Sequence, residues 1–381
     1  MKSRAEIDRV FQQAVETAQV PFALGVALSA EGILYESAVG PGIGLDSIFW
    51  IASMTKPLTT LAALQLVEQG KLDLDRPAAE VAPQLAEIPV LEGFDAAGKP
   101  RLRPARHSVT LRQLLTHTSG FCYEAQSVDS LRYIREAGLP PPRSCKMKVF
   151  ETPLMFDPGE RWEYGIGIDW AGRLVELAAG KTLDRYFVDH IFGPLGMIDT
   201  GYKPPPEKLS RVALMHARIA GAGLTPMPRQ FPEPMEFAPG GGGLTSTGRD
   251  YARFLRMFMN GGTLEGIRLL KPETIALMSQ NHIGDLKAGF MRSAAPHATA
   301  VTEFFPGIPK KWTLGFMLNE AEVPGRRSAG SLGWAGVGNT FFWIDRKRKI
   351  AGIFMTQVTP FCDPGVLATL DAFEAAVSAD A

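Results

Sequence analysis

The chain contains the sequence Ser53-Met54-Thr55-Lys56, and no other serine is followed by a lysine three residues later. Two side chains at this spacing on a helix share one face, so an amine would lie beside a hydroxyl. A serine hydroxyl is a weak nucleophile until a neighbouring base takes its proton, and a buried lysine gives up its charge more readily than one in water. The pattern predicts a serine nucleophile. The alternative, on spacing alone, is a helix-capping serine with an exposed lysine.

The sequence on both sides of Ser53 favours the catalytic interpretation. An apolar, strand-like run, Phe49–Ala52, leads directly into the serine, and residues 53–69 form a predicted helix that is apolar on most sides. Pro57 suits the first turn of this helix, and Gly70 suits its end. A lysine in the first turn of a buried helix does not simply point to solvent.

Working outward, strands and helices are predicted at both ends of the chain and mainly helices in the middle. The predicted helices are 5–18, 53–69, 111–115, 168–179, 183–191, 251–259 and 364–377, and the predicted strands are 22–29, 33–37, 313–318, 340–344 and 350–356. The basic run Arg346–Lys349 lies between two of these strands and reads as a hairpin turn. We expect an α/β domain (1–75 plus 240–381) interrupted by a mainly helical domain (76–239), with the active site between them.

The composition excludes several classes of function. Lys plus Arg and Asp plus Glu both number 40 of 381 residues, and a balanced chain without clustered cations gives no support for a nucleic-acid or membrane partner. No signal-peptide pattern follows Met1, and no apolar run approaches the roughly 20 residues that span a bilayer. The three cysteines form no C-x-x-C pair, and the six histidines form no H-E-x-x-H. Free thiols in a reducing cytoplasm, no metal and no cofactor are therefore expected.

Four segments, in order and at matching spacing, resemble the class C β-lactamase-like family of the penicillin-binding-protein and β-lactamase superfamily. They are Ile51–Pro77, Thr110–Gly120, Asp157–Tyr164 and Gly240–Phe254. With the later strand region, the resemblance runs from about residue 50 to residue 356. It implies an α/β fold of the β-lactamase type, with an antiparallel sheet flanked by helices and an inserted helical domain.

The resemblance also assigns roles to individual residues. Ser53 matches the acylated serine, Lys56 its partner, and Tyr164 the tyrosine that passes the proton between nucleophile, base and leaving group. The backbone N–H groups of Ser53 and Val337 match the oxyanion hole, whose donors act on charge that develops in the transition state. Without Ser53 and Lys56, Tyr164 would read as a buried core tyrosine.

Two departures from the β-lactamase pattern bear on the substrate. Ile166 stands where these enzymes carry an asparagine, and Trp334-Ala335-Gly336 stands where they carry Lys-Thr-Gly. These four residues are the candidate substrate-binding positions, although Trp334 also reads as an edge-strand aromatic. A pocket that loses a cation and gains apolar surface suits a neutral ester better than an anionic lactam. The departures point to the family VIII carboxylesterases and related acyltransferases.

Four functions are compatible with these motifs to different degrees. The first is an esterase for small to medium acyl esters, and the second is an acyltransferase that uses the same acyl-enzyme. A β-lactamase or D-Ala peptidase is disfavoured by the missing asparagine and lysine. A non-catalytic binding protein is disfavoured because serine, lysine and tyrosine are all present. A small-molecule ester is the expected partner, and the sequence does not predict the oligomeric state.

Overall fold

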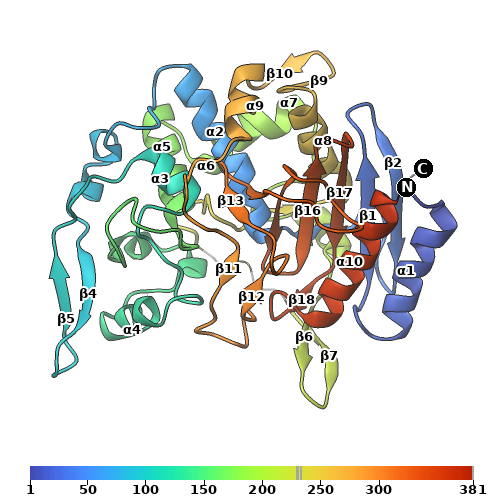
Figure 1. Cartoon of the computed structure of the whole chain (residues 1–381), viewed down its shortest axis with the longest axis horizontal. Helices are drawn as coiled ribbons and strands as arrows, with labels where there is room; N and C mark the ends of the chain where they lie inside the picture. The colour runs from blue at the N-terminus through green and yellow to red at the C-terminus, as the bar shows by residue number, and fades with distance from the viewer. Residues whose placement is uncertain (229–230, 232–233, 380–381) are drawn as a thin grey trace.

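The computed structural model describes residues 1–228, 231 and 234–379, and its centre is a seven-stranded antiparallel sheet (Figure 1). In spatial order the strands are β13 (Lys310–Trp312), β14 (Met317–Asn319), β15 (Leu332–Gly336), β16 (Thr340–Asp345), β17 (Ile350–Met355), β1 (Ala23–Leu28) and β2 (Ile33–Val39). The N-terminal hairpin thus pairs with strands from the last fifth of the chain, which confirms an antiparallel sheet assembled from both ends.

Helices cover both faces of this sheet. On one face α1 (Arg4–Glu16) lies beside α10 (Pro364–Ser378), and a Cβ added at Gly25 would come within 2.5 Å of the Phe11 ring of α1. On the other face α8 (Gly248–Met259) approaches so closely that a Cβ at Gly248 would lie 2.7 Å from Leu24. Strand β1 is therefore buried on both faces, which explains its uninterrupted apolar sequence.

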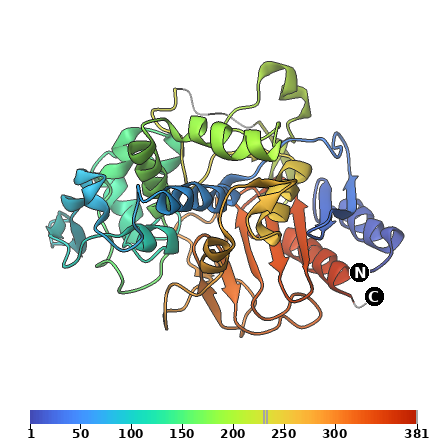
Figure 2. The same cartoon turned by 90° about the horizontal axis from the view of Figure 1, so that it is seen from above.

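The mainly helical part lies beside the sheet, and α2 (Lys56–Glu68) runs between the two (Figure 2). Ten of the 13 residues of α2 are buried, so the apolar coverage seen in the sequence reflects contacts on all sides. The neighbouring helices are α3 (Leu111–Thr116), α4 (Val128–Glu136), α5 (Gly167–Ala179), α6 (Leu183–Phe187) and α7 (Gly193–Leu195). Thr110 caps α3 through a reciprocal pair with Gln113.

Smaller elements complete the chain. They are β3 (Phe49–Trp50), β4 (Val90–Phe94), β5 (Pro100–Arg103), β6 (Met215–Ile219), β7 (Gly223–Met227), β8 (Thr245–Ser246), β9 (Thr263–Leu264), β10 (Ile267–Arg268), α9 (Pro272–Met278), β11 (Phe290–Met291), β12 (Thr302–Glu303) and β18 (Val358–Thr359). Short 3-10 and π turns are η1 (Ala52–Thr55), η2 (Ala78–Glu80), η3 (Pro83–Ala86), η4 (Pro142–Ser144), η5 (Met147–Glu151), η6 (Val188–Phe192) and η7 (Pro206–Arg211).

Most predicted elements are confirmed within a few residues, including the basic hairpin turn between β16 and β17. The predicted strand 313–318 is wrong. Its first four residues form the turn between β13 and β14, where the Thr313 N–H donates to the Phe316 carbonyl and Gly315 adopts a φ of +95°. An apolar run with β-forming residues misled the prediction because a glycine in the left-handed region reverses the chain inside it.

Two further expectations concern the cysteines and the membrane. Cys122, Cys145 and Cys362 are all buried and unpaired, which confirms free thiols. Within the described ranges, no helix combines the length and apolar character needed to cross a membrane. The domain boundaries at residues 75 and 240 stay a prediction.

Candidate active site

Ser53 lies in a tight turn, η1, rather than in the helix proper. The short pairing of β3 with β8 leads the chain into this turn, and Ala52, immediately before the serine, has a φ of +45°. A left-handed conformation costs a residue other than glycine about 1–3 kcal/mol and persists where the surroundings impose it. The strained turn presents Ser53 at the start of α2, and it marks this position as a candidate functional site.

Lys56, the first residue of α2, is fully buried beside Ser53. Its Nζ lies 3.0 Å from Ser53 Oγ, 3.2 Å from the Tyr123 hydroxyl and 2.6 Å from the Gly241 carbonyl oxygen. Nζ also lies 4.6 Å from the centroid of the Tyr164 ring. The structure therefore brings together the serine and lysine that the sequence paired, and it adds two oxygen neighbours.

Burial lowers the pKa of Lys56 from 10.5 to about 7, although the nearby Asp169 carboxylate opposes this change. A general base works best when its pKa lies near the operating pH. A large fraction of Lys56 is then a neutral amine at neutral pH, as removal of the Ser53 proton requires. His117 cannot take this role by titrating near pH 7, because burial and Lys56 hold its pKa well below 6.5.

We expect kcat/KM for a neutral ester to rise with pH through a midpoint near 7 and then to level off. The direction follows because the protonated amine, which dominates below the pKa of Lys56, cannot accept the serine proton. A pH series with an uncharged 4-nitrophenyl ester, corrected for spontaneous hydrolysis, measures this limb. A midpoint above 9 would mean that Lys56 has an ordinary pKa and is not the base.

Tyr164 lies on the other side of Ser53 and is almost fully buried. Its hydroxyl accepts a hydrogen bond from the Trp334 indole Nε1 at 3.1 Å. Burial raises the pKa of Tyr164, while its hydrogen bonds with Ser53 and Trp334 oppose the rise. Tyr164 is therefore a neutral phenol that can pass a proton between Ser53 and a leaving group.

His117 packs against Tyr164 and has a structural role. It ends α3 in a left-handed conformation, with φ of +59°, and its Nδ1 accepts the N–H of Gly165 at 3.3 Å. Its ring packs 4.6 Å from that of Tyr164, and Trp312 packs 4.9 Å from the histidine ring. These contacts fix the backbone that carries the tyrosine.

Strand β15 packs against the turn that holds Ser53. A Cβ at Gly336 would come within 2.2 Å of the Ile51 carbonyl oxygen, so only glycine lets β15 approach the nucleophile turn this closely. Val337 follows directly, and its N–H and that of Ser53 stay the predicted oxyanion hole. Ala335 and Ile166 are also buried, and Ile166 is only 1% exposed. Its assignment to substrate binding likewise remains a prediction.

The sequence analysis missed Tyr123 and Asp169, and it included Gly241 only as part of the Gly240–Phe254 segment. Asp169 lies in α5, whose buried residues are mainly apolar, and the residue is only 5% exposed. A carboxylate in an apolar helix requires a partner, and this signal could have identified it. Tyr123 had no comparable signal, because a lone tyrosine in a loop fits many roles.

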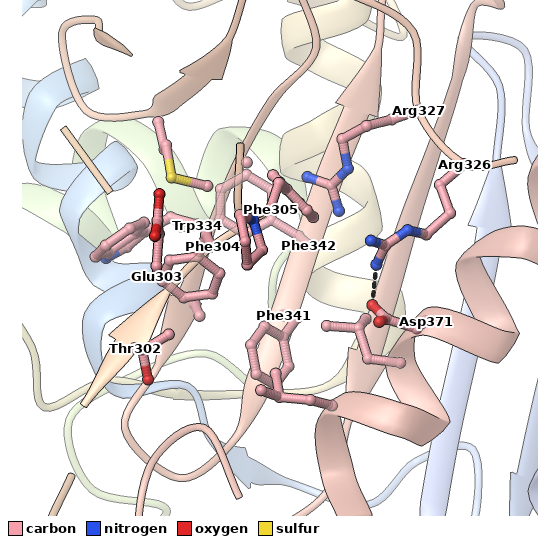
Figure 3. A pocket seen from close by; sticks show the side chains of 16 residues that line it. Thr302, Glu303, Phe304, Phe305, Arg326, Arg327, Trp334, Phe341, Phe342 and Asp371 are labelled. Carbon is pink, nitrogen blue, oxygen red and sulfur yellow. Dashed lines mark hydrogen bonds and ion pairs between the residues drawn. The ribbon is translucent and has the colours of Figure 1, made fainter. Parts of the chain in front are cut away.

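A cavity of about 260 Å³ adjoins the site on the α10 side of the sheet (Figure 3). Its lining includes Trp334 but not Ser53, Lys56 or Tyr164, so it neighbours the catalytic cluster without containing it. The Phe304 ring, which also lines the cavity, packs 5.7 Å from that of Trp334. Among the residues described, no three His, Cys, Asp or Glu side chains are placed to hold a metal ion.

The family model described as "Beta-lactamase" matches residues 7–376. The chain belongs to this family. Its fold is that of the class C β-lactamase-like serine hydrolase superfamily, as the motifs implied.

Three relatives within this family are informative. A lovastatin esterase from Penicillium rubens is 33% identical, over 96% of this chain and 95% of that protein. A monacolin J acid methylbutanoyltransferase from Aspergillus terreus is 32% identical, over 98% and 95%. The structure of a simvastatin synthase mutant (LovD6) from Aspergillus terreus superposes with a TM-score of 0.85 at 32% identity, covering 98% of this chain and 93% of that one.

These likenesses define the enzyme class. The protein is an enzyme of the serine hydrolase type, acting as an acyl-enzyme hydrolase or acyltransferase. Of these relatives, one is named as an esterase and another as a methylbutanoyltransferase. Family membership alone therefore does not establish whether water or another molecule accepts the acyl group.

Proposed function

We propose that this protein is a carboxylesterase for small to medium neutral acyl esters and that Ser53 carries the acyl group. The Lys56 amine takes the Ser53 proton as the serine oxygen attacks the ester carbonyl carbon. Tyr164 relays the proton to the departing alkoxide, which leaves as the alcohol. Water then attacks the acyl-serine carbonyl by the same proton path in reverse and releases the carboxylic acid.

The observation that carries this proposal is the position of Trp334. In the motif match Trp334 stands where β-lactamases carry the cation that meets a lactam carboxylate, and in the structure its indole N–H donates to Tyr164. A carboxylate brought beside this apolar side chain would lose its hydration without gaining a partner, which is strongly unfavourable. A neutral ester carries no such cost, and its alkyl groups gain roughly 0.8 kcal/mol per buried CH₂.

Three cations close to this region in the sequence do not replace the missing one, because each has an acidic partner. Arg327 forms a two-pronged pair with Glu374 at 2.6 and 2.8 Å, and neither residue is more than 6% exposed. Arg326 pairs with Asp371, as Figure 3 shows, and Lys310 pairs with Glu303 at 3.2 Å. Recruiting any of them to a lactam would break an existing ion pair.

We expect kcat/KM for a short-chain 4-nitrophenyl ester to exceed that for nitrocefin by at least about 100-fold. An unpartnered buried carboxylate costs several kcal/mol, and 1.4 kcal/mol corresponds to a factor of ten. Both substrates are assayed on one preparation, with Ser53→Ala as the blank. A nitrocefin value equal to or above the ester value would revive the β-lactamase interpretation.

Acyl transfer is a second candidate, favoured by the likeness to the methylbutanoyltransferase. Both reactions share the acyl-enzyme and differ in whether water or an alcohol takes the acyl group. Adding a graded series of alcohols to the ester assay separates them. A new ester formed faster than the free acid would assign the protein as a transferase, whereas continued release of acid supports the esterase.

A further inference from the structure

The three neighbours of Lys56 Nζ determine where its N–H groups and its lone pair point. A neutral amine has two N–H groups and one lone pair, and the lone pair must face Ser53 if Lys56 is to take its proton. The Gly241 carbonyl can only accept, so it takes one N–H. The other N–H must then go to the Tyr123 oxygen. Tyr123 must therefore accept from Lys56 and direct its own proton elsewhere.

Asp169 touches both of these acceptors. Its Oδ1 accepts the backbone N–H of Gly241 at 2.9 Å, and its Oδ2 lies 3.5 Å from the Tyr123 hydroxyl, which donates to it. The carboxylate is 95% buried, at 5% exposure. A Cβ at position 241 would lie 2.6 Å from Asp169 Oδ2 and 2.8 Å from the Tyr123 oxygen. Glycine at this position is what allows the three groups to meet.

We propose that Asp169 is a positioning residue that orients both acceptors of Lys56, and thereby directs the lysine lone pair at Ser53. The carboxylate receives the Tyr123 proton, so the Tyr123 oxygen can serve only as an acceptor toward the lysine. It also fixes the Gly241 peptide whose carbonyl takes the second lysine N–H. This inference rests on the proposed function, in which Lys56 is the base that activates Ser53.

The charges around the pair are few. Lys56 faces Asp169 from α5, and Tyr123, Tyr164 and His117 from the loops packed against α2; the tyrosines and the histidine are neutral, because burial raises the pKa values of the phenols and lowers that of the imidazole. Asp169 also faces Cys145 and Tyr202, whose pKa values are raised mainly by burial and further by the Asp169 charge. Asp169 is thus the anion whose charge affects the pKa of Lys56.

The Asp169 carboxylate also affects the pKa of Lys56. Burial raises the pKa of Asp169 above its usual value, and Lys56 with the Gly241 and Tyr123 donors opposes this rise in favour of the carboxylate anion. That anion raises the pKa of Lys56 against the effect of burial. Removing the charge should lower the pKa of the lysine and move the acidic limb of the rate profile to lower pH.

The test is Asp169→Asn. Its amide oxygen can keep the Gly241 contact, which turns the amide NH₂ toward Tyr123. The amide then donates to the Tyr123 oxygen, and the Tyr123 proton turns to the Lys56 lone pair. We expect kcat for a short-chain ester to fall about 100-fold, at the lower end of what general base catalysis contributes, with KM within about threefold. The acidic limb should also move to lower pH.

The double variant Asp169→Asn with Tyr123→Phe makes the test specific. Removing the Tyr123 hydroxyl frees the lysine lone pair, so the double variant should be at least about tenfold faster than Asp169→Asn alone. If Asp169 had only a structural role, the double variant would be slower than Asp169→Asn alone. The acidic limb of the rate profile would then not shift in Asp169→Asn. Asp95→Asn, in the exposed turn between β4 and β5, makes the same chemical change away from the site and should match the wild type.

Mass spectrometry of Ser53 after mixing with 4-nitrophenyl acetate tests the proposed function separately from the role of Asp169. An unacylated wild-type serine would overturn the proposed function. Normal acylation of the wild type, with Asp169→Asn equal to it in kcat and pH limb, would overturn the role of Asp169 alone. If Asp169→Asn does not fold, Tyr123→Phe should still slow turnover while leaving the acidic limb unchanged. Wild-type turnover in Tyr123→Phe would then refute the positioning network.

Discussion

Replacing Ser53 by alanine is expected to reduce ester turnover by roughly four or more orders of magnitude, as loss of a nucleophile does in other serine hydrolases. The hydroxyl is the atom that bonds to the acyl group, and the Ser-x-x-Lys pairing occurs once in the chain. Hydrolysis that remains can come only from water activated in the pocket.

The same substitution should leave the fold unchanged. Ser53 Oγ is a partner of Lys56 and Tyr164, and both keep other hydrogen-bond partners, Gly241 and Trp334 respectively. Circular dichroism and a melting temperature within a few degrees of the wild type would establish this. If the folded Ser53→Ala protein retained wild-type turnover, the nucleophile would have to be another residue.

The second large effect concerns the proton path. Lys56→Ala and Tyr164→Phe are each expected to lower kcat by roughly 10³-fold, and their combination should be at most about tenfold worse than the more damaging single change. Residues that act as one unit in catalysis are grossly non-additive, because losing either interrupts the path. Losses that multiply would show that the lysine and the tyrosine act independently.

The two single variants should differ in stability, which provides an internal control. Lys56→Ala leaves the Gly241 carbonyl and the Tyr123 hydroxyl without the Lys56 N–H donors. It also removes the positive charge that the protonated lysine places near the buried Asp169 carboxylate, and both losses destabilise the fold. Tyr164→Phe removes one hydroxyl and keeps the ring packed between His117 and Trp334. We therefore expect a lower melting temperature for Lys56→Ala and a small change for Tyr164→Phe, measured by thermal denaturation.

The sequence predicted the fold well where periodicity and termination signals agree. Residues 53–69 have a helical pattern ended by Gly70, and the structure places η1 and α2 over residues 52–68 with Gly70 in the left-handed conformation. It failed at residues 313–318, where one glycine turns an apolar run into a hairpin. The difference lies in tertiary contacts, because only the pairing of β13 with β14 shows where the strand must reverse.

The pairing of Ser53 with Lys56 could be predicted from the sequence, whereas the other partners of Lys56 could not. Ser53 and Lys56 lie three residues apart, so their proximity follows from local geometry alone. Tyr123 and Gly241 reach Lys56 from 67 and 185 residues away. A backbone carbonyl acceptor has no signature in the sequence, since every residue carries one. Such partners emerge only once the fold places the glycine loop beside α2.

The most direct test of the account is the site of acylation. The purified protein is mixed with a short-chain 4-nitrophenyl ester, quenched in acid within the first turnovers, digested and examined by mass spectrometry. We predict an added acyl mass on the peptide that contains Ser53, with no such adduct in Ser53→Ala. An acyl group on a different residue, or catalytic turnover without any acylated peptide under conditions that trap the intermediate, would contradict the acyl-enzyme mechanism.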